Sequence, residues 1–277
     1  MIQDIFPHHF NNQFLADRAI EANDYVLHFR DNKLLMKTAG SELELPRKKD
    51  FPEINGDAEA TFLFTLDDVS CFMLWNDLPT DEAVFDYKEI GFFRTFPQPE
   101  TAWISLVGFH LQHWYEEHRF CGKCGAKTKH KEDERAVFCS ECGTLFFPKI
   151  SPAIIVAITA GGKILLANNA NFRPGWFSLI AGYVDVGETL EETVLREVKE
   201  EVGLDVKNIR YFASQPWPLS GSLMVGFTAE ADQSQPIKID GKEITEAAWF
   251  ERGNLPSRPT NISIAGEMLD KFEKGEL

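Results

Sequence analysis

The spacing of apolar residues along the chain predicts strands and helices in both halves. In the first half, apolar runs at 60–66 and 71–76 predict two strands, and the polar residues 53–59 predict a turn ahead of them. Residues 101–118 place apolar side chains at three- and four-residue intervals, which predicts a helix. We therefore expect the first part of the chain to form a mixed domain.

After residue 150 the pattern changes to strands that alternate with helices. Strands are predicted at 153–168, 223–230 and 247–251, and helices near 190–202 and 262–274. Gly161 and Gly162 divide the first of these segments into two strands, because adjacent glycines suit a tight hairpin turn. This order of elements predicts an α/β domain.

The predicted helix at 190–202 has clear start and stop signals. Thr189 and Glu192 have the spacing of a capping box, so the helix is expected to begin near Leu190. Gly203 suits the position just after a helix, where a left-handed backbone is common. The apolar stripe of this helix is predicted to consist of Leu190, Val194, Leu195, Val198 and Val202.

Three glutamates lie at the edge of that stripe, which is an unfavourable place for like charges. Glu197 and Glu201 stand one helical turn apart, and Glu200 lies beside them. Like charges at this spacing destabilise a helix by about 0.2–0.5 kcal/mol per pair, and burial adds to the cost. A hard divalent cation reverses this balance, since carboxylate oxygens are its preferred ligands. A solvated glutamate face is the alternative explanation.

The overall composition permits folded domains and limits the classes of ligand. Of the 277 residues, 44% are hydrophobic and 12% are aromatic, which is enough for real cores. No apolar run approaches the length of a membrane span, and the first residues lack a secretory signal, so we expect a cytoplasmic protein without membrane contact. The net charge of −15 repels nucleic acid in general, so a phosphate ligand requires a cation or a local basic site.

Four of the five cysteines form two Cys-x-x-Cys pairs, and they are Cys121, Cys124, Cys139 and Cys142. Each pair places two thiolates on a tight turn, for which Gly122, Gly125 and Gly143 are expected to supply unusual backbone angles. Two such turns close a tetrahedral site that suits Zn²⁺. Four thiolates leave no position for water, so the spacing predicts one structural zinc per chain. Cys71 lies apart in an apolar run and is predicted to be a core residue.

A zinc ribbon also occurs in proteins that only bind nucleic acid or protein, and this non-enzymatic function is the main alternative to an enzyme. Four lysines support it, and they are Lys123, Lys127, Lys129 and Lys131. The acidic run 132–134 dilutes this basic patch. The ribbon is also a small part of the chain. Two roles are therefore considered for it, namely binding a ligand and holding domains together.

The segment 182–204 carries a longer fixed pattern, Gly-x5-Glu-x7-Arg-Glu-Val-x-Glu-Glu-x-Gly-Leu. It resembles the Nudix box of the Nudix hydrolases without departure, and so many fixed positions argue against a merely solvated glutamate face. The resemblance implies an α/β/α sandwich that hydrolyses nucleoside diphosphates linked to another group, with several Mg²⁺ or Mn²⁺ ions. It implies metal ligands at Glu197, Glu200, Glu201 and the backbone carbonyl of Ala181. The implied catalytic set adds Arg196, which orients the glutamates, and Glu188, which steadies the loop.

A second motif resembles the NADH pyrophosphatase branch of that family. Residues 214–222 read Ser-Gln-Pro-Trp-Pro-Leu-Ser-Gly-Ser, and the branch has Phe and Pro where this chain has Leu219 and Ser220. For these residues alone, a proline-rich loop with a buried tryptophan is the alternative. The branch also has a four-cysteine ribbon before the Nudix domain, an aromatic-proline step like Phe147-Pro148, and a homodimeric state.

The same resemblance implies the substrate contacts. In the motif they are Gln215, Pro216, Trp217, Pro218, Leu219, Ser220, Gly221 and Ser222. Phe147 and Tyr183 are expected to sandwich a base. Further contacts are expected from Ala265 and, more weakly, from Glu134 and Arg94. Glu243 is the implied additional metal ligand, and Glu246 is the competing candidate.

We therefore expect a zinc-containing, Mg²⁺- or Mn²⁺-dependent hydrolase that splits NADH or NAD⁺ into AMP and nicotinamide mononucleotide. Removal of NAD caps from RNA 5′ ends is the alternative within the enzyme class. Residues 121–150 carry six basic and four acidic side chains, so the ribbon is the segment suited to guide an RNA. The predicted domains are an N-terminal NADH-pyrophosphatase-like domain (1–118), a zinc ribbon (119–148) and a Nudix hydrolase domain (149–277).

Overall fold

The computed structural model describes residues 1–52, 60–260 and 262–277. The predicted turn at 53–59 lies outside these residues. The chain folds as two compact units. The carboxy-terminal unit consists of residues 1–2, 150–217 and 221–277, and the amino-terminal unit consists of residues 3–149 and 218–220.

A six-stranded sheet forms the centre of the carboxy-terminal unit. Its strands are β12 (Ser151–Ala160), β13 (Lys163–Asn169), β14 (Ile180–Tyr183), β15 (Val206–Trp217), β16 (Ser222–Ala231) and β17 (Ile244–Glu251). The strand order is β15-β16-β12-β13-β17, and β14 also pairs with β12. β12 and β16 run parallel, whereas the other pairs are antiparallel. The predicted hairpin joins β12 to β13, and both Gly161 and Gly162 have positive φ, 56° and 80°.

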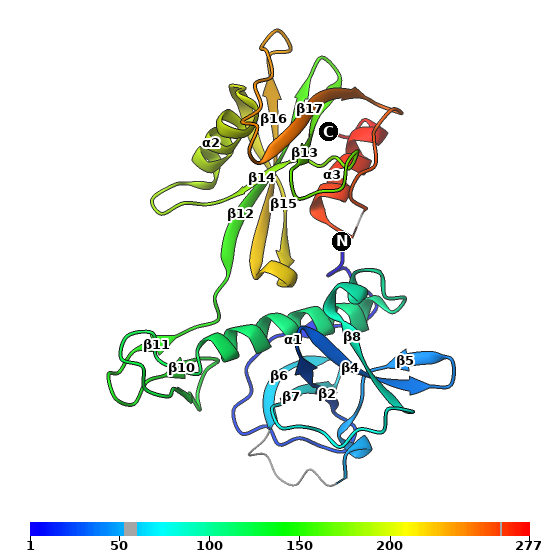
Figure 1. Cartoon of the computed structure of the whole chain (residues 1–277), viewed down its shortest axis with the longest axis vertical. Helices are drawn as coiled ribbons and strands as arrows, with labels where there is room; N and C mark the ends of the chain where they lie inside the picture. Colours follow the sequence, from blue (N-terminus) through cyan, green and yellow to red (C-terminus); the bar gives the residue numbers. More distant parts are fainter. Residues whose placement is uncertain (53–59, 261) are drawn as a thin grey trace. The chain divides into compact units, whose positions relative to one another are not determined.

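One helix covers each face of this sheet, α2 (Leu190–Val202) on one side and α3 (Ile264–Lys274) on the other (Figure 1). Successive side chains of β12 point to opposite faces. Ile154 and Val156 pack in the core that contains Val198 of α2, and Ile155 packs in the core that contains Met268 of α3. The two apolar cores therefore lie on opposite faces of one sheet, and the predicted α/β/α sandwich is confirmed.

Helix α2 begins and ends where the sequence predicts. The hydroxyl of Thr189 accepts from the N–H of Glu192, and the carboxylate of Glu192 accepts from the N–H of Thr189. Gly203 follows the helix with φ of 72°. The predicted apolar stripe is wrong at Leu195, which is 45% exposed. Neighbouring residues of a helix differ in direction by about 100°, so Leu195 points away from the face that buries Val194.

Two four-stranded sheets and one long helix form most of the amino-terminal unit. The first sheet has the order β1-β6-β7-β2, with bounds Phe10–Asn11, Ala60–Leu66, Val69–Leu74 and Tyr25–Leu27. The second contains β3 (Phe29–Arg30), β4 (Lys33–Ala39), β5 (Glu42–Glu44) and β8 (Phe85–Glu89), with β4 paired to the other three. The helices are α1 (Pro99–Glu117) and the 3₁₀ helices η1 (Lys48–Asp50), η3 (Ile90–Thr95) and η4 (Pro218–Ser220).

The strands and the helix predicted in the first half of the chain are present. The run 60–66 coincides with β6, the run 71–76 overlaps β7, and the helix 101–118 corresponds to α1. Cys71 is fully buried, as predicted for a core residue, and burial raises the pKa of its thiol. None of the described helices is both long enough and apolar enough to cross a membrane.

The ribbon follows α1 and contains three short strands. They are β9 (Lys129–His130), β10 (Val137–Phe138) and β11 (Leu145–Phe146), in the antiparallel order β11-β10-β9. β9 and β10 lie between the two cysteine-bearing turns, and β11 follows the second turn.

Candidate active site and zinc site

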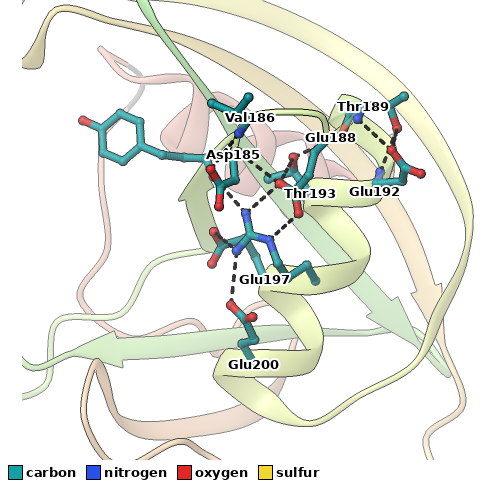
Figure 2. A network of polar contacts seen from close by, with 10 residues as sticks. Asp185, Val186, Glu188, Thr189, Glu192, Thr193, Glu197 and Glu200 are labelled. Atoms are coloured by element: carbon teal, nitrogen blue, oxygen red, sulfur yellow. Dashed lines mark hydrogen bonds and ion pairs between the residues drawn. The ribbon is translucent and has the colours of Figure 1, made fainter.

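Arg196 connects the acidic residues of α2 to the loop before the helix (Figure 2). Its Nη1 donates to Glu197 Oε1 at 2.8 Å and to Glu200 Oε2 at 3.1 Å. Its Nε and Nη2 donate to the two carboxylate oxygens of Glu188 at 2.5 and 2.9 Å. Nη2 also donates to the backbone oxygen of Tyr183 at 3.0 Å. One guanidinium thus holds three carboxylates and a strand in place through charge-assisted hydrogen bonds.

Glu188 fixes the loop between β14 and α2. Its Oε2 accepts from the N–H of Asp185 at 3.1 Å and from the hydroxyl of Thr193 at 2.9 Å, in addition to Arg196. The bond from Arg196 is the largest of the effects that lower the pKa of Glu188 to about 2. The sequence alone does not identify Thr193 as a hydrogen-bond partner of Glu188. The two side chains come into contact only because α2 begins just after Thr189.

Gly182 allows Glu197 to lie against strand β14. A Cβ atom at Gly182 would lie 2.0 Å from Cδ of Glu197 and 2.1 Å from its Oε1. No side chain at position 182 is compatible with this position of the carboxylate, which explains a glycine there although its φ is not left-handed. Glu197 therefore lies beside the segment of β14 that contains Ala181.

Glu201 is a buried carboxylic acid. It is 7% exposed, and among the residues that the structure describes no hydrogen bond or ion pair reaches its side chain. Burial is the main cause that raises the pKa of Glu201 to about 8, and the charges of Glu197, Glu243 and Asp240 add to it. Burial likewise raises the pKa of Glu197, against the opposing effect of Arg196. A buried and a half-buried carboxyl group that together lack a full countercharge fit a divalent cation, because it supplies that charge.

Electrostatics separate the two candidates for the further metal ligand. Glu243 is among the main charges that raise the pKa values of Glu197 and Glu201, and Glu246 is not. Asp240 holds this segment, since its carboxylate accepts from the N–H of Glu243 at 3.0 Å and from that of Ile244 at 2.9 Å. An aspartate followed by Gly241 is a turn signal that identifies such a residue from sequence.

The oxygen donors on α2 suit a hard cation such as Mg²⁺ or Mn²⁺. Their geometry differs from that of the cysteines. In the described part of the chain, the four cysteines are the group of at least three metal-binding side chains whose donor atoms all lie within 4.8 Å of one another. Glu197 and Glu200 are instead held by Arg196.

Tyr183 and Ser222 meet at the end of the sheet near this loop. Tyr183 is 54% exposed, and its hydroxyl forms a hydrogen bond of 3.2 Å with that of Ser222 at the start of β16. The exposed ring of Tyr183 therefore stays accessible for stacking, as the resemblance implies, and its backbone is fixed by Arg196.

Two predicted substrate contacts are packed inside the carboxy-terminal unit. Gln215 is fully buried, with its Nε2 donating to the carbonyl of Ile262 at 3.0 Å and its Oε1 accepting from the N–H of Ile264 at 2.6 Å. Gln215 thereby fastens the start of α3 to the sheet. Ala265 is 5% exposed and belongs to the apolar core under α3. These contacts favour a structural role for both residues.

The tryptophan motif does not form a loop throughout. Pro216 and Trp217 pair with β16 at the end of β15, and the 3₁₀ helix Pro218–Ser220 follows. β15 is an edge strand, where a proline without an N–H is tolerated. Gly221, with φ of 63°, completes the turn into β16. The interpretation as a proline-rich loop is therefore wrong for Pro216 and Trp217.

The remaining predicted contacts belong to the amino-terminal unit. Phe147 is 54% exposed just after β11, and Arg94 is exposed in η3. Glu134 forms an ion pair with Lys131 at 2.8 Å. The substrate contacts of these three residues stay predictions.

The four predicted zinc ligands come together in the ribbon. The sulfur atoms of Cys121 and Cys142 are 3.6 Å apart, and those of Cys124 and Cys139 are 3.4 Å apart. Four Zn–S bonds of about 2.3 Å in a tetrahedron separate the sulfur atoms by about 3.8 Å. The cluster therefore fits a zinc ion closely.

The two cysteine turns have the same backbone geometry. The N–H of Gly125 donates to the carbonyl of Cys121 at 2.8 Å, and that of Gly143 donates to the carbonyl of Cys139 at 2.9 Å. Both glycines are left-handed, with φ of 76° and 71°. The prediction is wrong for Gly122, whose φ is not in that region, because only the last residue of each turn requires it.

Comparison with known proteins agrees with this architecture. Three family models match in succession: the NADH pyrophosphatase-like rudimentary NUDIX domain (23–114), the NADH pyrophosphatase zinc ribbon domain (116–147) and the NUDIX domain (149–272). The chain is 38% identical over 232 residues to the NAD-capped RNA hydrolase NudC of Stutzerimonas stutzeri (strain A1501), which covers 83% of this chain and 79% of that protein. It is 45% identical over 195 residues to the protein of the same name from Citrobacter koseri, covering 70% and 72%.

A solved Nudix hydrolase from Nitrosomonas europaea aligns with 56% of this chain and 90% of its own, with a TM-score of 0.49 and 22% identity. The sequence relatives and family models are decisive: the chain belongs to the Nudix hydrolases and is a hydrolase. Two of the three matching models are those of NADH pyrophosphatases, so the resemblance to that branch is confirmed. The purely non-enzymatic alternative is thereby excluded.

Proposed function

We propose that this hydrolase cleaves the pyrophosphate of NADH or NAD⁺ and releases AMP and nicotinamide mononucleotide, with Mg²⁺ or Mn²⁺ as the divalent cation. The observation that carries the proposal is Glu201, a buried carboxyl group that has no hydrogen-bond or ion-pair partner among the described residues. It lies beside Glu197 and within the electrostatic reach of Glu243. Such a group is costly unless it serves to bind a cation. The NADH pyrophosphatase models over the ribbon and the amino-terminal region support the choice of substrate.

In the reaction, water attacks one phosphorus, the bridging P–O bond breaks, and each product keeps one phosphate. When bound, the divalent cations supply an activated water and neutralise charge on the phosphoryl oxygens. Glu197, Glu200 and Glu201, with the carbonyl of Ala181, are the groups that would hold these cations, and Glu243 is the further candidate. Arg196 keeps the first two carboxylates at fixed positions on the helix.

Recognition of the substrate is proposed to use exposed aromatic surfaces. Tyr183 offers an exposed ring at the end of β14, where its hydroxyl is fixed by Ser222. Trp217 lies at the end of β15, where the strand gives way to η4. We assign Tyr183 to base stacking and Trp217 to the nicotinamide half, and base stacking by Phe147 stays a separate proposal.

The test is product analysis with the purified full chain. NADH incubated with Mn²⁺ is expected to give AMP and reduced nicotinamide mononucleotide in equal amounts. The proposal would be contradicted if free nicotinamide were released, or if no AMP formed with any divalent cation that is added.

A second function has a specific observation in its favour, because the curated relatives are named NAD-capped RNA hydrolases. We propose the removal of NAD caps from RNA as an activity of the same site, since both reactions cleave the same pyrophosphate. The decisive comparison is kcat/KM for NADH against that for a short NAD-capped RNA. A preference for the RNA would make it the better substrate, and equal values would mean that only the NAD moiety is recognised.

Other features stay proposals. The three-part organisation at 1–118, 119–148 and 149–277 is supported by the order of the family models. A structural zinc at the cysteines is supported by the ribbon model and by the spacing of the sulfur atoms. The homodimeric state and the cytoplasmic location rest on the sequence analysis alone.

A further inference from the structure

The amino-terminal unit contains a pocket that the hydrolytic site does not use. Its volume is about 560 Å³, within the range of small-molecule sites. It lies between the first sheet, the end of α1 and the ribbon. The residues that matter for its chemistry are Trp75, Tyr115, Arg119, Lys127 and His130.

The charge of this pocket is opposite to that of the chain. The protein carries a net charge of −15, yet the described lining contains no acidic residue and includes Arg119 and Lys127. Among the residues that the structure describes, neither of these cations forms an ion pair, and both are exposed. Unpaired cations without an acidic neighbour in the lining attract an anion.

An aromatic surface lies beside the cations. Trp75 is 36% exposed, and its indole N–H donates to the hydroxyl of Thr61 at 2.9 Å, which fixes the ring. Its ring meets Tyr115 edge to face at 6.0 Å, and Tyr115 stacks on His130 at 4.7 Å. A fixed and partly exposed indole is a suitable platform for a flat ring.

A neighbouring pocket of about 330 Å³ shows what a balanced lining looks like. It shares Tyr115 and His130 with the first pocket, but its lining includes the acids Asp17, Glu132 and Glu134. Its cations are paired: Lys131 with Asp133 and Glu134, and Arg18 with Glu21. Of these two pockets, the larger is therefore the one whose cations form no ion pair with the described residues.

We propose that the larger pocket binds a nucleotide, with the base stacked on Trp75 and the phosphate bound by Arg119 and Lys127. This chemistry is shared by a free nucleotide and by one nucleotide within a single-stranded RNA. The proposal does not rest on the hydrolytic activity, because none of its residues belongs to the site on α2.

The RNA arm of the test uses a short fluorescent RNA with a 5′ monophosphate, which offers no pyrophosphate to cleave. Binding is followed by anisotropy at several salt concentrations without added Mg²⁺ or Mn²⁺. Each phosphate contact on a single strand contributes about 0.7 to the slope of log K against log salt. Because both cations bind the same phosphate, the double variant Arg119→Ala/Lys127→Ala is expected to lower that slope by about 0.7. Lys131→Ala, which removes a paired lysine from the neighbouring pocket, is expected to leave it unchanged.

Trp75 is tested separately because stacking and charge give different signatures. Trp75→Leu is expected to weaken RNA binding about ten-fold, at an unchanged salt slope, and Trp75→Phe is expected to recover most of the loss. Zinc content, thermal midpoint and the rate of NADH hydrolysis are measured for every variant. These values are expected to match the wild type, which separates a binding defect from misfolding and from failure of the proposed activity.

The second arm titrates AMP calorimetrically into the wild type and the double variant. A free nucleotide as the natural occupant predicts unchanged RNA affinity but the loss of one AMP site per chain, with the site on α2 remaining. Loss of RNA affinity in the double variant and in Trp75→Leu assigns the pocket to RNA. If the variants bind both RNA and AMP like the wild type, the proposal is overturned.

Discussion

Replacement of Gly182 by alanine tests whether the position of Glu197 against strand β14 is essential. The new methyl carbon would lie 2.0 Å from Cδ of Glu197, whereas carbon atoms in contact prefer about 3.5–4.0 Å. The carboxylate must therefore retreat by about 1.5 Å or more. Because a misplacement of about 1 Å at a catalytic group can cost about 100-fold in rate, we expect kcat to fall by about 100-fold.

The same substitution is expected to leave the fold almost unchanged. The atoms that would clash belong to the end of a flexible side chain, and Gly182 has an ordinary backbone conformation. Gly226→Ala is the contrasting variant in the same unit, because its Cβ would lie 2.7 Å from Cδ1 of Ile264 in the core. It should lower the thermal midpoint more than Gly182→Ala does. Gly91→Ala adds a methyl group in open space and should change neither stability nor rate.

The assay pairs AMP release from NADH at saturating Mn²⁺ with thermal denaturation followed by circular dichroism. A normal kcat for Gly182→Ala would show that Glu197 does not need its place beside β14, and its assignment as a metal ligand would fail. A loss of kcat that is matched by a loss of thermal midpoint, as in Gly226→Ala, would mean that Gly182 serves the fold alone.

Three further predictions address the other parts of the chain. Glu201→Gln keeps the shape but removes a charged ligand, so kcat should fall about 100-fold or more with the fold intact, and near-normal turnover would move its role to Glu200 or Glu243. Cys121→Ser should remove about one zinc per chain and lower the thermal midpoint, which full zinc content by metal analysis would contradict. Trp217→Ala should lower kcat/KM for NADH about ten-fold or more, and it should lower kcat/KM for ADP-ribose less, because ADP-ribose lacks nicotinamide. Equal losses for the two substrates would mean that Trp217 has a structural role or contacts the adenine.

The parts of the fold that were predictable from sequence depend on short-range signals. The capping box at Thr189 and the glycine at 203 set the ends of α2 through contacts within a few residues. The two Cys-x-x-Cys turns likewise contain their own hydrogen bonds. The prediction that Leu195 belongs to the buried stripe of α2 was wrong. Which side chains of the helix are buried depends on how far the sheet extends under it, and that is a tertiary property.

The roles of Gly182 and Gln215 depend on contacts that join distant segments. Gly182 is required because α2 brings Glu197 onto β14, fifteen residues away in sequence. Gln215 lies in a motif that implies substrate binding, yet its amide bonds the backbone near residue 264. The nucleotide pocket is the extreme case, because its residues come from a strand end, the end of a helix and the ribbon. No sequence motif predicts that Trp75, Arg119 and Lys127 line one pocket.

The two sites solve the same electrostatic problem in different ways. A chain with a net charge of −15 must attract phosphate locally. On α2 the carboxyl group of Glu201 is buried and needs a bound cation, whereas Arg119 and Lys127 are exposed and need none. Exposed charges are screened by salt far more than buried ones. Added monovalent salt should therefore weaken binding in the pocket before it slows NADH hydrolysis, and omission of Mg²⁺ and Mn²⁺ should abolish hydrolysis while binding in the pocket persists.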